Sequence, residues 1–195
     1  MKCPRCGNSA RLAPIRFGLP DFTEELVRQV ENEEVYMGGC LIMDGYPRFH
    51  CFACGENVGK KPVLRTKKGL EDYRFIVTGI HLVEEGSPQI FMEKKDGHIR
   101  LEIRPACADP RSSYERLMTD EEWDELLELL YKQLYLHEWN RIFITRRFPE
   151  GEKWELTIKL TEDREISYKG FGAYPPYWEE LKAAFRPFFQ EAGIS

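Results

Sequence analysis

The chain has 195 residues, of which 42% are hydrophobic and 13% aromatic, so it can bury a sizeable core as one large domain or two small ones. No run of 18 apolar residues occurs, and we expect no transmembrane helix and no membrane partner. The net charge of −5 argues against a general nucleic-acid binder. Residues 1–68 carry 11 basic and 8 acidic side chains, whereas residues 69–195 carry 17 and 25, so any nucleic-acid contact is expected only in the first third.

Two copies of one short frame, Cys-x-x-Cys followed by glycine, stand at residues 3–7 and 51–55. Two residues between the cysteines let both thiolates face one ion, and the glycine can adopt the positive φ that turns backbone N–H groups toward the sulfurs. Together the frames predict a closed tetrahedral site with the ligands Cys3, Cys6, Cys51 and Cys54. We expect structural zinc; a rubredoxin-like iron centre and a pair of redox dithiols are the alternatives. His50 is a neighbour able to replace a ligand.

The two other cysteines, Cys40 and Cys107, are expected to be small buried hydrophobes. The alternative is a reactive thiol beside a base, as in a Cys40–His50 or Cys107–His137 pair, which would make the chain a thiol-dependent enzyme. Cys-x-x-Cys pairs more often hold metal where thiols stay reduced, and the first frame leaves no room for a signal peptide. We therefore expect a cytoplasmic protein.

Residues 1–59 are predicted to form the first unit. An extended segment over residues 13–20 precedes a short helix near residues 22–32, for which Asp21 and Glu24 have the spacing of a capping box. Residues 35–43 read as a strand, and Gly38-Gly39 inside it indicates a bulge or a close approach of the backbone. The metal site would thus close a loop that carries a helix and a strand.

Residues 60–69 are the best candidate for a linker between two units. Five of the first nine are basic, and a proline and a glycine interrupt the segment. A solvated linker is the favoured interpretation, and contact with phosphates is the alternative.

Residues 70–195 are predicted to form an acidic α+β domain. We expect strands at residues 75–83, 90–95, 98–103, 141–148, 154–160 and 165–169, with Asp96-Gly97 as a hairpin turn and a loop at 105–116. Thr119 and Glu122 predict the capped start of the clearest helix, with Met118 and Trp123 as a hydrophobic staple. A second helix is expected over residues 177–191, where Pro187 should break or kink it.

This order reads coarsely as strand-strand-strand-helix written twice. The simplest way to bury both apolar helix stripes is an antiparallel sheet with both helices on one face. The predicted fold is therefore α+β, with a four-cysteine zinc ribbon followed by this sheet domain.

The first unit also resembles a known family. With CPRCG, PIRFGLP, a short acidic helix, MGGC and PRFHCFACG, residues 1–59 resemble a small zinc-ribbon family common in bacteria, whose members follow the pattern CPxCG…PIxYGxP…GGC…PxxxCxxCG. The resemblance implies zinc at Cys3, Cys6, Cys51 and Cys54, and structural places for Gly38, Gly39 and Cys40. It implies no reaction. The rest of the chain, including EKWELTI and GFGAYPPYWEEL, is similar to uncharacterised bacterial domains only loosely.

Binding is the favoured function, because no Gly-rich phosphate loop, G-x-S-x-G or H-E-x-x-H motif occurs in the sequence. We expect a non-enzymatic binding or adaptor protein with an unidentified protein partner. One alternative is contact with nucleic acid through the basic side chains Arg5, Arg11, Arg16, Arg48, Lys60 and Lys61. A cluster of aromatic residues before the last helix is either a recognition surface or a seal under that helix, the latter being favoured: Phe171, Tyr174, Tyr177 and Trp178.

Overall fold

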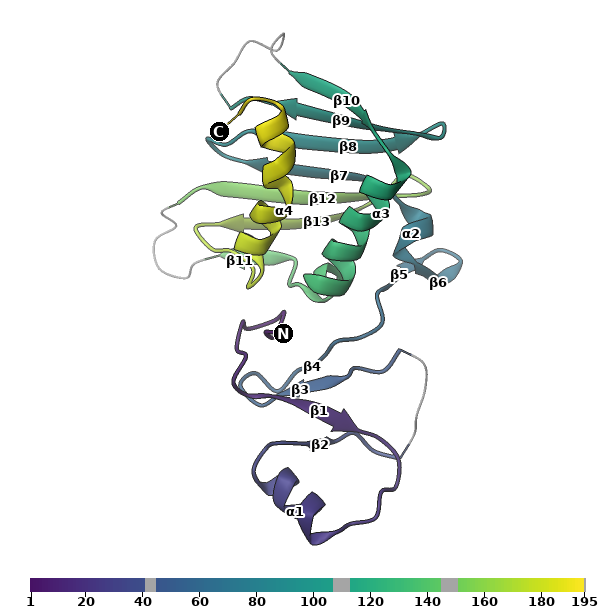
Figure 1. Cartoon of the computed structure of the whole chain (residues 1–195), viewed down its shortest axis with the longest axis vertical. Coiled ribbons are helices and arrows are strands. Elements are labelled where there is room, and N and C mark those ends of the chain that lie inside the picture. Colours follow the sequence, from purple (N-terminus) through teal and green to yellow (C-terminus); the bar gives the residue numbers. More distant parts are fainter. Residues whose placement is uncertain (41–44, 107–112, 145–150, 195) are drawn as a thin grey trace.

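The computed structural model describes residues 1–40, 45–106, 113–144 and 151–194. The N-terminal unit, at the bottom of Figure 1, is a small sheet in the order β2-β1-β3-β4. Its strands are β1 (Leu12–Arg16), β2 (Tyr36–Met37), β3 (Phe49–Cys51) and β4 (Asn57–Val58). β1, which follows the first cysteine frame in the chain, pairs parallel with β2 and antiparallel with β3, the strand that ends at Cys51.

Helix α1 (Glu24–Glu31) crosses from β1 to β2, within the range expected from the sequence. The predicted cap was wrong, because the Thr23 hydroxyl, and not Asp21, accepts the N–H of Leu26, at 3.2 Å. The strand predicted over residues 35–43 is only Tyr36–Met37 long, and residues 41–44 lie outside the described residues. A β-carbon at Gly38 would lie 2.4 Å from Ile15 Cγ2, so the close approach of the backbone is confirmed there.

The segment predicted as a linker has regular structure. β5 (Val63–Thr66) and β6 (Gly69–Asp72) form an antiparallel hairpin, and Leu64 on it is buried in the core of the second unit. Arg164 donates to the carbonyl of Arg65 at 2.6 Å. The segment expected to be a solvated basic linker therefore contains a strand, in which Val63, Leu64 and Arg65 pair with the residues after the Lys67-Lys68 turn. The short helix α2 (Tyr73–Ile76) follows.

The second unit contains a seven-stranded sheet in the order β10-β9-β8-β7-β12-β13-β11. Neighbouring strands are antiparallel except for β11, which pairs parallel with β13. The strands are β7 (Val77–Glu84), β8 (Gln89–Lys95), β9 (His98–Arg104), β10 (Tyr114–Met118), β11 (Ile142–Ile144), β12 (Lys153–Leu160) and β13 (Arg164–Phe171). The hairpin predicted at Asp96-Gly97 joins β8 and β9.

Helices α3 (Asp120–Glu128) and α4 (Trp178–Glu191) both cover the same face of this sheet (Figure 1). Alternation along β12 explains why that face is apolar, because Trp154, Leu156, Ile158 and Leu160 are buried and the residues between them are not. The expected α+β architecture, with both helices on one face, is therefore confirmed.

The predicted start of α3 is confirmed in detail. Thr119 and Glu122 make both hydrogen bonds of the capping box, and Met118 and Trp123 are buried beside it. The helix continues as one π-helical turn (Leu129–Gln133) and a 3₁₀ turn (Leu136–Glu138). Pro187, where the sequence predicts a break or a kink, does not end the helix; α4 runs on to Glu191, with Leu181 and Phe185 fully buried before it.

Two strand predictions need correction. The range 75–83 begins with helix α2, and the strand starts only at Val77. The predicted loop at 105–116 ends in an additional strand, β10, and residues 107–112 lie outside the described residues. Within the described residues, four strands of the seven-stranded sheet therefore precede α3 and three lie between α3 and α4, instead of three and three. Among the described residues no helix is long and apolar enough to cross a membrane.

Candidate metal centre

The two Cys-x-x-Cys frames fold into the same turn. In each, the glycine N–H donates to the carbonyl of the first cysteine, at 2.8 Å from Gly7 to Cys3 and 2.7 Å from Gly55 to Cys51. The N–H of each first cysteine donates to the carbonyl five residues on, at 2.9 Å in both cases. Both glycines have a φ of 77°, the left-handed conformation that the sequence predicts for them. The turns therefore present their sulfurs in equivalent ways.

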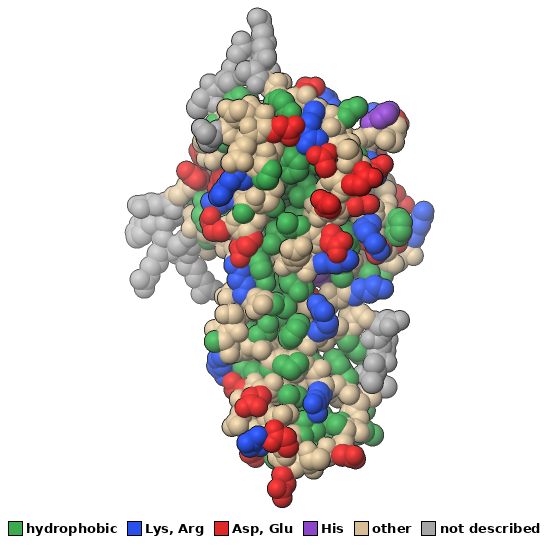
Figure 2. Space-filling model, viewed as in Figure 1, with side chains coloured by type: hydrophobic (Ala, Val, Ile, Leu, Met, Phe, Trp, Pro, Cys, Tyr) green, Lys and Arg blue, Asp and Glu red, His purple; other side chains and the backbone are tan. Residues whose placement is uncertain are grey.

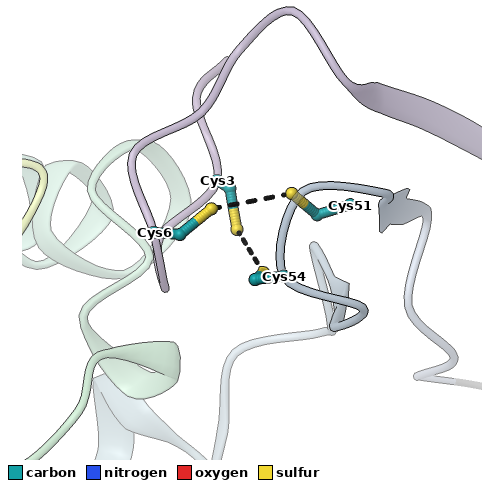
Figure 3. Close-up of side chains that lie close together, drawn as sticks. All are labelled: Cys3, Cys6, Cys51 and Cys54. Carbon is teal, nitrogen blue, oxygen red and sulfur yellow. Dashed lines mark hydrogen bonds between the residues drawn. The ribbon is translucent and has the colours of Figure 1, made fainter.

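The four thiols converge on one point (Figure 3). All four sulfur atoms lie within 4.8 Å of one another, with Cys3–Cys54 at 3.8 Å and Cys6–Cys51 at 3.7 Å. Metal–sulfur bonds of about 2.3 Å in a tetrahedron place the sulfurs about 3.8 Å apart. The four cysteines thus lie close enough to bind a metal, and the donor set fits a tetrahedral thiolate site.

The thiols differ in their surroundings. Cys3 and Cys51 are fully buried against Val58, Leu12 and Phe49, whereas Cys6 and Cys54 are exposed. Burial raises the pKa of Cys3 to about 12. Burial also acts on Cys51, but hydrogen bonds from the backbone of Cys54 and Ala53 outweigh it and lower the pKa of that thiol. A bound divalent cation would favour the thiolate form of all four.

His50 is not a fifth member of the cluster. Its Nδ1 lies 2.6 Å from Asn57 Oδ1, and its ring stacks on Tyr36 with the ring centres 3.8 Å apart. The imidazole therefore supports the turn between β3 and β4.

The first frame is docked on the loop before α4. The hydroxyl of Tyr177 donates to the carbonyl of Lys2 at 2.7 Å and accepts the N–H of Lys2 at 3.1 Å. The Lys2 ammonium forms an ion pair with Glu180 at 2.5 Å, and a β-carbon at Gly7 would touch Pro176. The metal-site turn is thus held against residues some 170 positions away in sequence.

The strand after the second frame is held by the turn that follows α3. The carboxylate of Glu138 accepts the N–H groups of Gly59 at 3.1 Å and Lys60 at 2.6 Å, and His137 Nε2 lies 3.2 Å from the carbonyl of Lys60. Burial raises the pKa of Glu138 and lowers that of His137 to about 4, because both side chains are shielded from water. We refer to these contacts as the Glu138 clamp.

The six basic residues predicted to contact nucleic acid separate into two sets. Three are placed apart: Arg5 bonds Asn140 at 2.7 Å, Arg11 pairs with Glu33 at 2.6 Å, and Arg16 is exposed at the end of β1. The other three, Arg48, Lys60 and Lys61, line one cavity of about 530 Å³ together with Lys132. Sequence reasoning did not point to Lys132, His137 or Glu138 in this context, because nothing in the sequence places the end of α3 beside residues 59–61.

The aromatic cluster before α4 is largely interior. Tyr177 and Trp178 are buried, as expected of residues that seal the sheet under the last helix. Tyr174 is 39% exposed and packs on Trp178. Phe171 lies on the opposite face of the sheet, where it lines a cavity of about 410 Å³ with Ile142 and Ile144.

Among the described residues no histidine is hydrogen-bonded to Cys40, as a thiol-dependent enzyme that uses this residue would require. This residue is exposed, not buried as expected, and among the described residues it makes no hydrogen bond to His50. Cys107 lies outside the described residues. No protein-family model, curated protein or solved structure matches this chain. Its function is therefore inferred from its own residues.

Proposed function

We propose that the chain is a zinc-binding protein whose metal is structural and whose role is binding, as an adaptor, without catalysis. The observation that carries the proposal is the convergence of four sulfur atoms within 4.8 Å. Four thiolates fill every position of a tetrahedral site, as in structural zinc centres, and leave none for water or substrate. The likeness of residues 1–59 to a bacterial zinc-ribbon family supports zinc over iron, and metal-holding Cys-x-x-Cys pairs are typical of the cytoplasm, where thiols stay reduced.

The structural role follows from what the site connects. The strands β3 and β4 are only three and two residues long, and the hydrophobic cluster beside the cysteines is small. Zinc binding contributes on the order of 10 kcal/mol to the folding of small zinc-finger peptides. In this chain the ion would join the turn docked on Tyr177 to the strand held by the Glu138 clamp, and so fix the N-terminal unit on the sheet domain.

Elemental analysis of the purified protein tests the metal. We expect one zinc per chain, its loss in Cys51→Ser, and faster amide hydrogen exchange throughout residues 1–59 in that variant. Cys40→Ser is the matched control, because Cys40 is an exposed cysteine outside the cluster, and it should keep its zinc. Iron in place of zinc, or a fully loaded and folded Cys51→Ser variant, would contradict the proposal.

A surface on the open face of the sheet supports a protein partner. Ile142 and Ile144, on the edge strand β11, are 66% and 62% exposed and line the cavity that Phe171 shares. Exposed apolar side chains around a hollow are typical of protein contacts. Ile142→Asp should abolish capture of a defined partner from nuclease-treated bacterial lysate. Val27→Asp, which changes an exposed apolar residue of α1, should leave capture intact.

A further inference from the structure

A basic cavity lies where the N-terminal unit meets the end of α3. Its volume of about 530 Å³ is in the range of ligand sites, and four cations line it: Arg48, Lys60, Lys61 and Lys132. None of the described residues that line it is acidic. The chain as a whole has a net charge of −5, whereas this cavity is positively charged, so it favours the binding of an anion.

Three of these cations have no carboxylate partner among the described residues. Arg48, Lys60 and Lys61 are exposed and form no ion pair there, although Lys61 helps to lower the pKa of Asp72 and the charge of Lys60 acts against the burial that raises the pKa of Glu138. Lys132 pairs with Glu128 at 2.7 Å on the exposed surface, where such a pair contributes little and exchanges easily. The charges are therefore available to a ligand.

The backbone that carries the cations is fixed. The Glu138 clamp holds the N–H and the carbonyl of Lys60 and so aligns Lys60 and Lys61 at the rim. Lys132 stands in the π-helical turn, which the bond from the Leu134 N–H to the Leu129 carbonyl closes at 2.9 Å. Cations on ordered backbone lose less entropy when an anion binds.

Aromatic rings alternate with the charges. The half-buried Tyr46 and Tyr135 also line the cavity, together with Tyr131, whose ring is buried and stacked on Tyr73. Tyr46 and Lys60 continue into a second cavity of about 460 Å³. There Phe17 stacks on Tyr46, with ring centres 4.9 Å apart and an angle of 17° between the planes. Figure 2 shows Lys and Arg side chains on the surface where the N-terminal unit meets the sheet domain.

We infer that this pair of cavities binds single-stranded nucleic acid, with phosphates at the cations and a base against the tyrosine rings. A strand without a complement exposes the faces of its bases, and proteins bind such strands by combining basic grooves with aromatic rings. This ligand goes beyond the protein partner proposed above and uses a different surface of the chain. The same chemistry would also accept a free nucleotide, so the two sources must be separated by experiment.

Fluorescence anisotropy with a labelled 20-nucleotide single strand, the matching duplex and a competing nucleoside monophosphate tests the inference. We expect the single strand to bind more tightly than the duplex. The slope of log affinity against log salt should be about −2 to −3, as three or four phosphate contacts predict. Lys60→Glu/Lys61→Glu should weaken binding at least tenfold, and Tyr46→Ala should remove the preference for the single strand.

The matched control is Lys67→Glu/Lys68→Glu, which makes the same change of charge at the exposed turn between β5 and β6. It should retain most of the affinity; equal loss in both variants would overturn the inference, as would equal binding of the duplex. Competition by the monophosphate as strong as that by the strand would identify a single nucleotide as the ligand of the same site. If the purified protein contains zinc but does not bind the labelled strand, the inference is overturned and the proposed function still stands. If the purified protein binds the strand but contains no zinc, the proposed function is contradicted and the inference stands.

Discussion

The hydroxyl group of Tyr177 makes hydrogen bonds to both polar groups of the Lys2 backbone, at 2.7 Å and 3.1 Å, although the two residues are 175 positions apart. Tyr177 is buried, and the turn that it meets carries Cys3 directly after Lys2. One phenol group thus connects the sheet domain to the metal-site turn.

Tyr177→Phe should therefore loosen the N-terminal turn while leaving the core intact. Each hydrogen bond contributes about 0.5–1.5 kcal/mol, so we expect a loss of about 1–2 kcal/mol of unfolding free energy and faster hydrogen exchange at residues 2–7. Tyr131→Phe is the matched control, because the buried Tyr131 hydroxyl has no hydrogen-bond partner among the described residues. That variant should be neutral or slightly more stable; equal losses in the two variants would contradict the role of Tyr177.

His137 should make stability depend on pH. Its pKa is lowered to about 4 in the folded protein, against about 6.5 when unfolded, so the unfolded state binds the extra proton between these values. The contribution of the neutral imidazole is full above pH 6.5 and is lost as the pH falls toward 4, by at most about 3 kcal/mol. The raised pKa of Glu138 acts in the opposite direction and is common to the parent and the variant below.

Urea unfolding of the parent protein and of His137→Gln from pH 4 to pH 7.5 measures the contribution of His137 to the free energy of unfolding. The amide can still donate to the Lys60 carbonyl but does not titrate, so the difference in stability between parent and variant should narrow or reverse as the pH falls. His98→Gln, which changes an exposed histidine, should follow the parent at every pH. Parallel curves for His137→Gln and the parent would refute the assignment.

Arg116 should contribute more than an ordinary surface cation. It extends from β10 to Glu122 at the start of α3, at 2.7 Å, and to Glu191 at the end of α4, at 2.9 Å. Its guanidinium also lowers the pKa of Glu122, the residue that completes the capping box. Arg116→Met should cost about 1–3 kcal/mol of unfolding free energy. Arg100→Met should cost clearly less, because the Arg100 side chain is 56% exposed and pairs with Glu115 on the surface of the sheet.

Local signals in the sequence predicted most of the fold. Thr119 and Glu122 mark the start of α3, Asp96-Gly97 marks the β8–β9 hairpin, and matched glycines at 7 and 55 mark the two turns. Each of these features is decided by residues within five positions of one another. The convergence of the four cysteines is the exception, since only the repetition of one frame indicated a contact across 44 residues.

Features decided by distant partners were missed. β10 begins after a stretch rich in proline and charge, and it is a strand because it pairs with β9. The hairpin of β5 and β6 looked like a linker because its burial depends on Leu64 reaching the core of the sheet domain. The Glu138 clamp depends on where the end of α3 meets β4, and a single buried carboxylate gives no pattern in the sequence.

The contact between Lys2 and Tyr177 also sets an order of events during synthesis. Synthesis proceeds from the N-terminal to the C-terminal side, so Cys3 and Cys6 are made before Tyr177. The side chain that covers their turn is made some 170 residues later. The first cysteine turn therefore leaves the ribosome well before the residue that holds it in the folded protein has been made.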